Sequence, residues 1–338
     1  MNTFSRLLPL LLLVGLAGCA TPKDEQVVPF TQEQVKSLFA RARPPQAFGL
    51  TVYSSEVGPF FAGASRVHQG DVARLSFQGA RDSTAPLVAL AGRGIKGLPA
   101  LIDTTSKDNW INAVAGQQLG IVMLVGPAPY QMQAQHVYDE IGGAAGLVQK
   151  VMLDESHVEN VVFFMQAASG PLGSTARWVE NPAPVLTLGN ALLRGFSFVQ
   201  LNYPERSAVF ASTARFPPPD ASTLLAKLPM KDVMGAIAVD GTLDGDPVSI
   251  LIDAAGDYDL VLNEPPDTTM RRLSIGDLVF PPEVNVVSSM DQGLGPTVYP
   301  RVGRRLLSRF KVTFDFRNKQ IYFERPVPLE RTTEMGIP

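Results

Sequence analysis

Residues 98–111 read Leu98-Pro-Ala-Leu-Ile-Asp-Thr-Thr-Ser-Lys-Asp-Asn-Trp-Ile111. The apolar run Ala100-Leu-Ile102 predicts a buried strand, and Asp103 follows that strand directly. A carboxylate at the end of an apolar strand is desolvated, so it needs either hydrogen bonds from backbone amides or a chemical use for its shifted pKa. We therefore expect the chain to be organised around Asp103.

The same arrangement recurs 150 positions later (253 minus 103), where Ser249-Ile-Leu-Ile252 leads into Asp253. A second repeat follows each acid, because residues 189–196 and 303–310 both read G-x-x-L-L-x-x-F, 114 positions apart (303 minus 189). Each of these motifs precedes an alternating pair of strand-like segments. The spacings predict two related halves, of which the second is shorter by 36 residues (150 minus 114).

The two acids resemble those of the aspartic peptidases, the pepsin and retropepsin group, whose hallmark is an apolar doublet followed by Asp-Thr/Ser-Gly. Asp103-Thr-Thr-Ser106 has threonine where the family has glycine, and Asp253-Ala-Ala255 replaces both following residues. The segment 310–324 is similar to the closing hairpin of the bacterial retropepsin-like proteins. The resemblance implies a mostly β, two-lobed aspartic-peptidase-like fold with duplicated closed β-barrel lobes and a short N-terminal helix.

In that family the two acids share one proton at the lobe interface, because like charges about 3 Å apart cannot both ionise. One carboxylate takes a proton from water, and the other donates a proton to the peptide carbonyl. The resemblance implies that Asp103 and Asp253 are catalytic and that no metal or cofactor is needed. The residues expected to support the pair are Thr104, Thr105, Ser106, Ala254 and Ala255.

The altered motifs leave two functions open. Thr104 can still make the hydroxyl bond to the opposite lobe that the resemblance implies, but Ala254 cannot return it. Thr105 and Ala255 place a Cβ where the family's glycine lets backbone and substrate approach the acids. A working endopeptidase and an inactive pseudopeptidase that binds extended peptides, or serves as an envelope assembly lipoprotein, both remain.

A glycine-rich stretch follows the first acid, with the sequence Ile141-Gly142-Gly143-x-x-Gly146. It resembles the flap of retroviral peptidases, and Tyr138 is a candidate for the aromatic residue that pepsin-like flaps place beside the acids. Glycines at a hairpin tip let the backbone lie close over a ligand. A plain glycine turn is the alternative. One flap over two lobes is the pepsin plan.

Residues 1–18 predict a lipoprotein signal peptide. Arg6 precedes an apolar segment, and Leu16-Ala-Gly-Cys19 matches a bacterial lipobox. Cys19 is the only cysteine, so lipidation would leave no thiol for a disulfide or a metal. The apolar run is shorter than the roughly 20 residues of a membrane span. The residue after Cys19 is Ala20 and not the aspartate that resembles an inner-membrane retention signal. We therefore expect an outer-membrane lipid anchor facing the periplasm.

Composition agrees with a mostly β chain, since 338 residues include 29 Gly, 28 Pro and 45% hydrophobic residues. Without residues 1–18, the chain has 28 basic and 32 acidic side chains, which excludes a nucleic-acid partner. We expect a monomer whose partners are a peptide or protein and, through the lipid, the membrane. The expected divisions are a tether at 19–30, an N-terminal lobe with the flap at 31–214, a linker at 215–231, a C-terminal lobe at 232–325 and a tail at 326–338.

Other site signatures are weak. Gly92-Arg-Gly-Ile-Lys-Gly97 matches G-x-G-x-x-G, but a strand follows it instead of the helix that a dinucleotide site requires, which favours a hairpin turn. The segment 240–246 predicts the equivalent hairpin in the second half. His68, His136 and His157 have no metal-ligand spacing. We expect a helix over 31–42.

Overall fold

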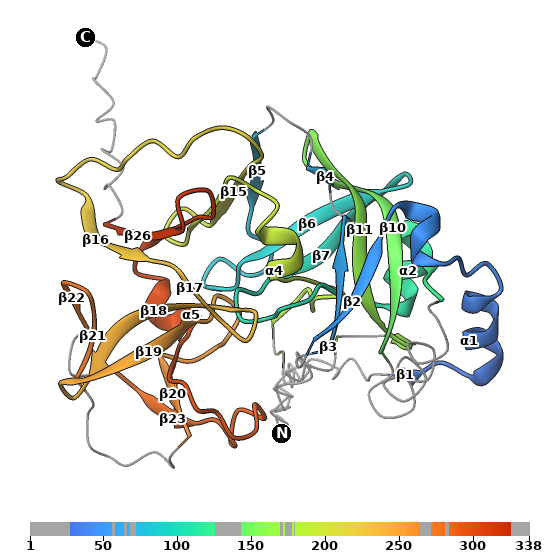
Figure 1. Ribbon diagram of the computed structural model, residues 1–338. Coiled ribbons are helices and arrows are strands. Elements are labelled where there is room, and N and C mark those ends of the chain that lie inside the picture. Colours follow the sequence, from blue (N-terminus) through green and yellow to red (C-terminus); the bar gives the residue numbers. More distant parts are fainter. Residues whose placement is uncertain are drawn as a thin grey trace, which may run out of the picture.

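The computed structural model describes residues 28–55, 58–63, 66–67, 72–125, 143–169, 172, 178, 180–263, 272–280 and 284–325. Strands dominate these residues, as the composition predicts (Figure 1). The helices are short and comprise α1 (Gln32–Phe39), η1 (Pro45–Phe48), α2 (Ala113–Leu119), α4 (Asn190–Leu193) and α5 (Arg304–Leu307). The expected N-terminal helix is present as α1, where the Thr31 side chain and Gln34 form a capping box.

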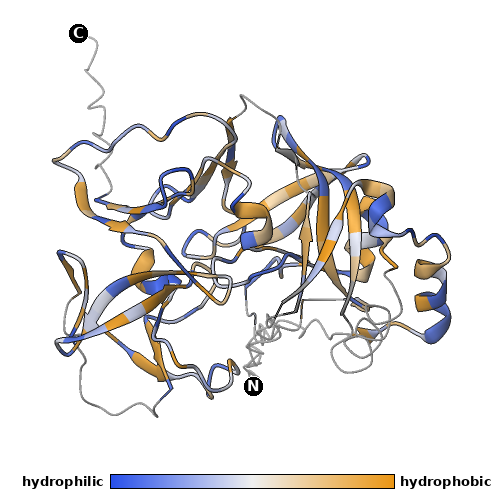
Figure 2. Cartoon of the chain, in the orientation of Figure 1, coloured by the Kyte–Doolittle hydropathy of each residue, from blue (hydrophilic) through white to orange (hydrophobic). Residues whose placement is uncertain are grey.

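The N-terminal lobe contains a closed barrel. Its strands pair in the order β11-β8-β13-β7-β6-β10, and β10 pairs back with β11. The members are β6 (Leu87–Gly92), β7 (Ile95–Ile102), β8 (Trp110–Asn112), β10 (Gly143–Leu153), β11 (Ser156–Gln166) and β13 (Leu186–Leu188). Figure 2 shows many hydrophobic residues along these strands. Many of their side chains are fully buried. The prediction of a closed barrel is confirmed for this lobe.

Shorter strands surround the barrel. β9 (Val122–Met123) pairs with β10, and β4 (Arg66–Val67) pairs with β11. β2 (Thr51–Ser55) and β3 (Gly58–Ala62) form a separate hairpin, while β1 (Val28–Pro29) pairs with β12 (Ala168–Ser169). The end of the predicted tether therefore belongs to the N-terminal lobe.

The C-terminal lobe has a sheet in the order β22-β21-β18-β19-β24-β20-β23, with β17 beside β18. Its strands are β17 (Lys231–Val233), β18 (Ala236–Leu243), β19 (Asp246–Ile252), β20 (Leu260–Leu262), β21 (Leu273–Ile275), β22 (Leu278–Val279), β23 (Val286–Ser288) and β24 (Arg301–Val302). Within the described residues this sheet stays open between β22 and β23. The second lobe is thus a β lobe, as expected, and its sheet forms a half-barrel within the described residues.

A third sheet joins the two lobes. Its order is β16-β26-β25-β14-β15-β5, and β14 lies antiparallel to β25 with Phe198 opposite Asp315. The strands are β5 (Val72–Ser76), β14 (Phe198–Asn202), β15 (Ser207–Ala211), β16 (Leu224–Pro229), β25 (Lys311–Asp315) and β26 (Gln320–Glu324). The expected linker is thus wrong over 224–229, because Ala226 and Leu228 alternate inward and make this segment a strand.

The internal duplication is present in the topology. β13 runs parallel to β7 and antiparallel to β8, and β24 runs parallel to β19 and antiparallel to β20. A short helix follows the middle strand in each half, α4 after β13 and α5 after β24. The hairpins that precede the acids also match, because Arg93 and Gly94 in one and Asp244 and Gly245 in the other have positive φ. The two acids therefore end equivalent strands.

Candidate functional site

Asp103 and Asp253 are held by the same backbone contact in each half. Asp103 follows β7, and its N–H donates to the carbonyl of Leu188 at 3.0 Å. Asp253 follows β19, and its N–H donates to the carbonyl of Val302 at 2.8 Å. Because Leu188 and Val302 end the parallel strands β13 and β24, each acid emerges where three strands of its sheet meet.

Thr104 connects the two acid loops. Its side chain is fully buried, and its hydroxyl donates to the carbonyl of Ile252 while accepting from the N–H of Ala254 at 3.0 Å. The Thr104 carbonyl also accepts from the N–H of Ile237 at 2.9 Å. Ala254 has no hydroxyl to return the bond, so the connection runs from the first loop only. Thr104 thereby places the residues on either side of Asp253 beside the first loop.

Asp103 is surrounded by donors from its own loop. Its Oδ1 accepts from the Thr105 N–H at 2.8 Å, the Thr105 hydroxyl at 2.8 Å and the Ser106 N–H at 3.0 Å. Thr105, which stands where the family has glycine, therefore turns its side chain back to the carboxylate. The Ser106 hydroxyl donates instead to the carbonyl of Asp108 at 2.6 Å. The first loop thus fixes one oxygen of Asp103 with three hydrogen bonds.

Asp253 has a different set of donors. Its Oδ1 accepts from the N–H groups of Ala255 at 3.1 Å and Gly256 at 2.8 Å. Its Oδ2 accepts from the hydroxyl of Tyr258. The sequence did not suggest Tyr258, because this residue occupies the position of Asp108 in the first half, five residues after the acid. The only available signal was that four consecutive residues without hydroxyls follow the second acid, before Tyr258.

The two carboxylates interact electrostatically. Asp253 is only 3% exposed, and this burial, followed by the charge of Asp103, raises the pKa of Asp253 to about 6. The Tyr258 hydrogen bond and the charge of Arg301 oppose that rise but do not cancel it. Below about pH 6 Asp253 is therefore protonated. Such a pair can accept a proton at one acid and donate one from the other.

Buried asparagines position the loops behind the acids. Asn190 is 2% exposed, and its Nδ2 donates to the carbonyls of Thr104 at 2.8 Å and Gly235 at 2.7 Å. The side chain of Asn109 accepts from the N–H of Gly189 at 2.9 Å and donates to the carbonyl of Val162 at 3.0 Å. Asn190 therefore joins α4 to both halves, a contact that sequence reasoning missed because each partner is a main-chain atom.

The predicted flap falls only partly within the described residues. Gly143 begins β10, and Gly146 pairs with Met123 of β9 and with Phe163 of β11. Both glycines therefore lie in the strand and not at a hairpin tip, and the expectation of a tip is wrong for these two. A Cβ on Gly146 would lie 2.6 Å from the side chain of Ile121, so this glycine allows close packing. Tyr138, Ile141 and Gly142 lie outside the described residues, as does Cys19.

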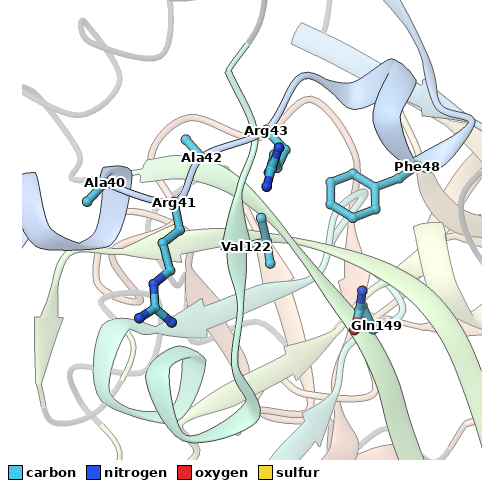
Figure 3. A pocket seen from close by; sticks show the side chains of 7 residues that line it. All are labelled: Ala40, Arg41, Ala42, Arg43, Phe48, Val122 and Gln149. Atoms are coloured by element: carbon cyan, nitrogen blue, oxygen red, sulfur yellow. The ribbon is translucent and has the colours of Figure 1, made fainter.

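The structure also has a cavity whose lining residues do not belong to the acid loops. This cavity of about 590 Å³ lies beside the segment between α1 and η1, with Arg41, Arg43 and Phe48 around it (Figure 3). Val122 of β9 and Gln149 of β10 also line it. Among the described residues no cluster of His, Cys, Asp or Glu could hold a metal ion. None of the helices described is long and apolar enough to cross a membrane.

Comparisons with known proteins give distant structural neighbours among solved structures. No protein-family model matches the chain, and no curated protein matches it. A solved structure titled "Crystal structure of Basic 7S globulin from soybean" is 12% identical, with a TM-score of 0.47, and the match covers 75% of this chain and 94% of that one. The chain itself has two acids after equivalent strands of two β lobes, which is the arrangement that the resemblance in the sequence implies.

Proposed function

We propose that this chain is an aspartic endopeptidase in which Asp103 and Asp253 activate water for hydrolysis of a peptide bond. The observation that supports this most is the Thr104 hydroxyl, which bonds the backbone on both sides of Asp253 and so holds the two acid loops together. Fixed donors on both carboxylates add the preorganisation that catalysis requires. A fold alone supports no activity, so the proposal rests on this site.

The proposed reaction uses one proton on the pair of acids. The ionised carboxylate takes a proton from water, the resulting hydroxide attacks the carbonyl carbon, and the protonated acid donates to the carbonyl oxygen. Collapse of the tetrahedral intermediate then breaks the C–N bond, and the amine leaves with a proton from the pair. The raised pKa of Asp253 supports such sharing, because one acid stays protonated below about pH 6.

An inactive peptide-binding protein is the second candidate. The side chains of Thr105 and Ala255 support it, because each adds a Cβ beside a carboxylate where a substrate would approach. In this candidate the acids would remain as hydrogen-bonding groups for an extended peptide. The structure is compatible with both candidate functions, so an assay for peptide cleavage is needed to distinguish them.

We also propose that the chain is attached to the outer membrane by a lipid on Cys19 and faces the periplasm. The Leu16-Ala-Gly-Cys19 sequence supports this location, and the residue that follows, Ala20, is not the aspartate of a retained lipoprotein. A peptidase in this place would meet envelope proteins or their fragments as substrates. Labelling of the full chain with a radioactive fatty acid tests the anchor, and Cys19→Ala should abolish the label.

The test of activity is cleavage of a mixed peptide library by the full chain in detergent between pH 3 and pH 7. We expect cleavage by the wild type and none by Asp103→Asn or Asp253→Asn. Asp315→Asn is the matched control, because Asp315 is also buried but lies in the third sheet. Cleavage by either Asp103→Asn or Asp253→Asn would refute the proposal. Measurable peptide binding without cleavage would favour the second candidate.

A further inference from the structure

The two acid loops differ in the hydroxyl groups that they offer. After Asp103 the chain reads Thr-Thr-Ser106, with three hydroxyls, whereas after Asp253 it reads Ala-Ala-Gly256, with none. Each carboxylate nevertheless accepts one hydroxyl donor, from Thr105 in the first loop and from Tyr258 in the second. Thr105 lies two residues after Asp103, whereas Tyr258 lies five residues after Asp253. The repeat of the acid loops therefore does not explain why Tyr258 supplies the second hydroxyl.

Tyr258 is held in a space that only glycines leave open. A Cβ on Gly256 would lie 2.4 Å from the Tyr258 ring, and a Cβ on Gly303 would lie 2.4 Å from the same ring and 2.3 Å from the Tyr258 carbonyl. Gly303 precedes α5, and the Tyr258 carbonyl accepts from the N–H of Arg305. The ring is thus fixed from both sides, with its hydroxyl on Oδ2 of Asp253.

We propose that Tyr258 is a positioning residue for Asp253, whose hydroxyl replaces the donors that the second acid loop has lost. This inference rests on the proposed function of the pair. Tyr258 is 3% exposed, and burial, together with the neighbouring charge of Asp253, raises its pKa well above the ordinary value, so that the phenol stays a donor. It cannot serve as the base. Its effect is to hold one oxygen of Asp253 in place and to stabilise the ionised form of that acid.

The charged and titratable groups around Asp253 allow this effect to be isolated. They are Asp103 after β7, Arg301 on β24, Tyr258 in its own loop and Tyr203 after β14. Tyr203 is also buried, but its hydroxyl donates to the carbonyl of Ala254 at 3.5 Å and not to a carboxylate. Tyr203→Phe is therefore a matched control for Tyr258→Phe, because both variants remove one buried phenolic oxygen near the same acid.

The experiment is a pH titration of the aspartate carboxyl carbons by NMR in the full chain, labelled with carbon-13 at aspartate. Asp253→Asn assigns the Asp253 signal by removing it. Loss of a hydrogen bond to a charged group should raise the Asp253 pKa by about one to two pH units in Tyr258→Phe. The phenyl ring keeps the packing against Gly256 and Gly303, and Tyr203→Phe should leave the titration within a few tenths of a unit of the wild type.

The outcomes separate this inference from the proposed function. An unchanged Asp253 titration in Tyr258→Phe, or an equal change in Tyr203→Phe, would overturn the positioning role even if the wild type cleaves peptides. An upward change confined to Tyr258→Phe supports the role even if no cleavage is found. Where the wild type cleaves, the alkaline limb of kcat/KM should move to higher pH in Tyr258→Phe by the same amount, which a purely structural role would not cause.

Discussion

Replacing Asp253 with asparagine should make the folded chain more stable at neutral pH. Burial and the charge of Asp103 raise the pKa of Asp253 from the ordinary 3.8 to about 6 in the folded state. The folded chain therefore binds this proton more tightly than the unfolded chain does. The stability that comes from this tighter binding is fully present below pH 3.8 and is lost as the pH rises through about 6.

The size of the effect follows from the difference between the two pKa values. A difference of about two pH units corresponds to about 3 kcal/mol at neutral pH. The uncharged asparagine avoids this cost, and its oxygen can still accept from the N–H groups of Ala255 and Gly256. Its amide would meet the Tyr258 oxygen, so the phenol proton loses its acceptor at a cost of about 1 kcal/mol. The expected net gain for Asp253→Asn is about 2 kcal/mol.

Urea unfolding at pH 7.5 and pH 4 measures this difference. The variant should be more stable than the wild type at pH 7.5, and most of the gain should be absent at pH 4. Asp315→Asn is the control, because Asp315 accepts from the N–H and the side-chain amide of Asn318 on separate oxygens. The Asp315→Asn variant should be less stable than the wild type at both pH 7.5 and pH 4. A variant at Asp253 that is less stable than the wild type at pH 7.5, or a difference independent of pH, would refute the reasoning.

Two further substitutions test the geometry of the site. Thr104→Val removes the buried hydroxyl and leaves the backbone of the second loop without two hydrogen bonds, so it should lower the free energy of unfolding by about 2 to 4 kcal/mol. Thr104→Ser should recover most of that loss, and a valine variant as stable as the serine variant would contradict the bonding role. Gly303→Ala places a methyl group 2.3 Å from the Tyr258 carbonyl and should destabilise the chain by more than about 2 kcal/mol in urea. A neutral effect at Gly303 would show that Tyr258 is not confined.

The positions of the two acids could be predicted because their signal is local. Each acid follows a short apolar strand, and the same leucine-containing motif comes later in each half, so the order of strand, acid and short helix can be predicted from the sequence. The turns that precede Asp103 and Asp253 were equally readable, since glycine occupies the second position of both.

The remaining features depend on contacts between distant segments. Tyr258 reaches Asp253 only because two glycines make room for its ring, and one of them lies 45 residues further along (303 minus 258). Asn190 bonds to main-chain carbonyls, which leave no trace in the pattern of residue types. The alternation of apolar and polar residues predicts that 198–202 and 311–315 are strands, but alternation alone does not specify that β14 pairs with β25.

The pairing of β14 with β25 also determines how the molecule can come apart. Five residue pairs, from Phe198–Asp315 to Asn202–Lys311, join the two halves in one antiparallel ladder. Separating the halves would expose two strand edges whose backbone groups are no longer paired within the sheet, which favours association with other chains. We therefore expect the whole chain to unfold in a single cooperative transition, and we expect neither half to fold on its own.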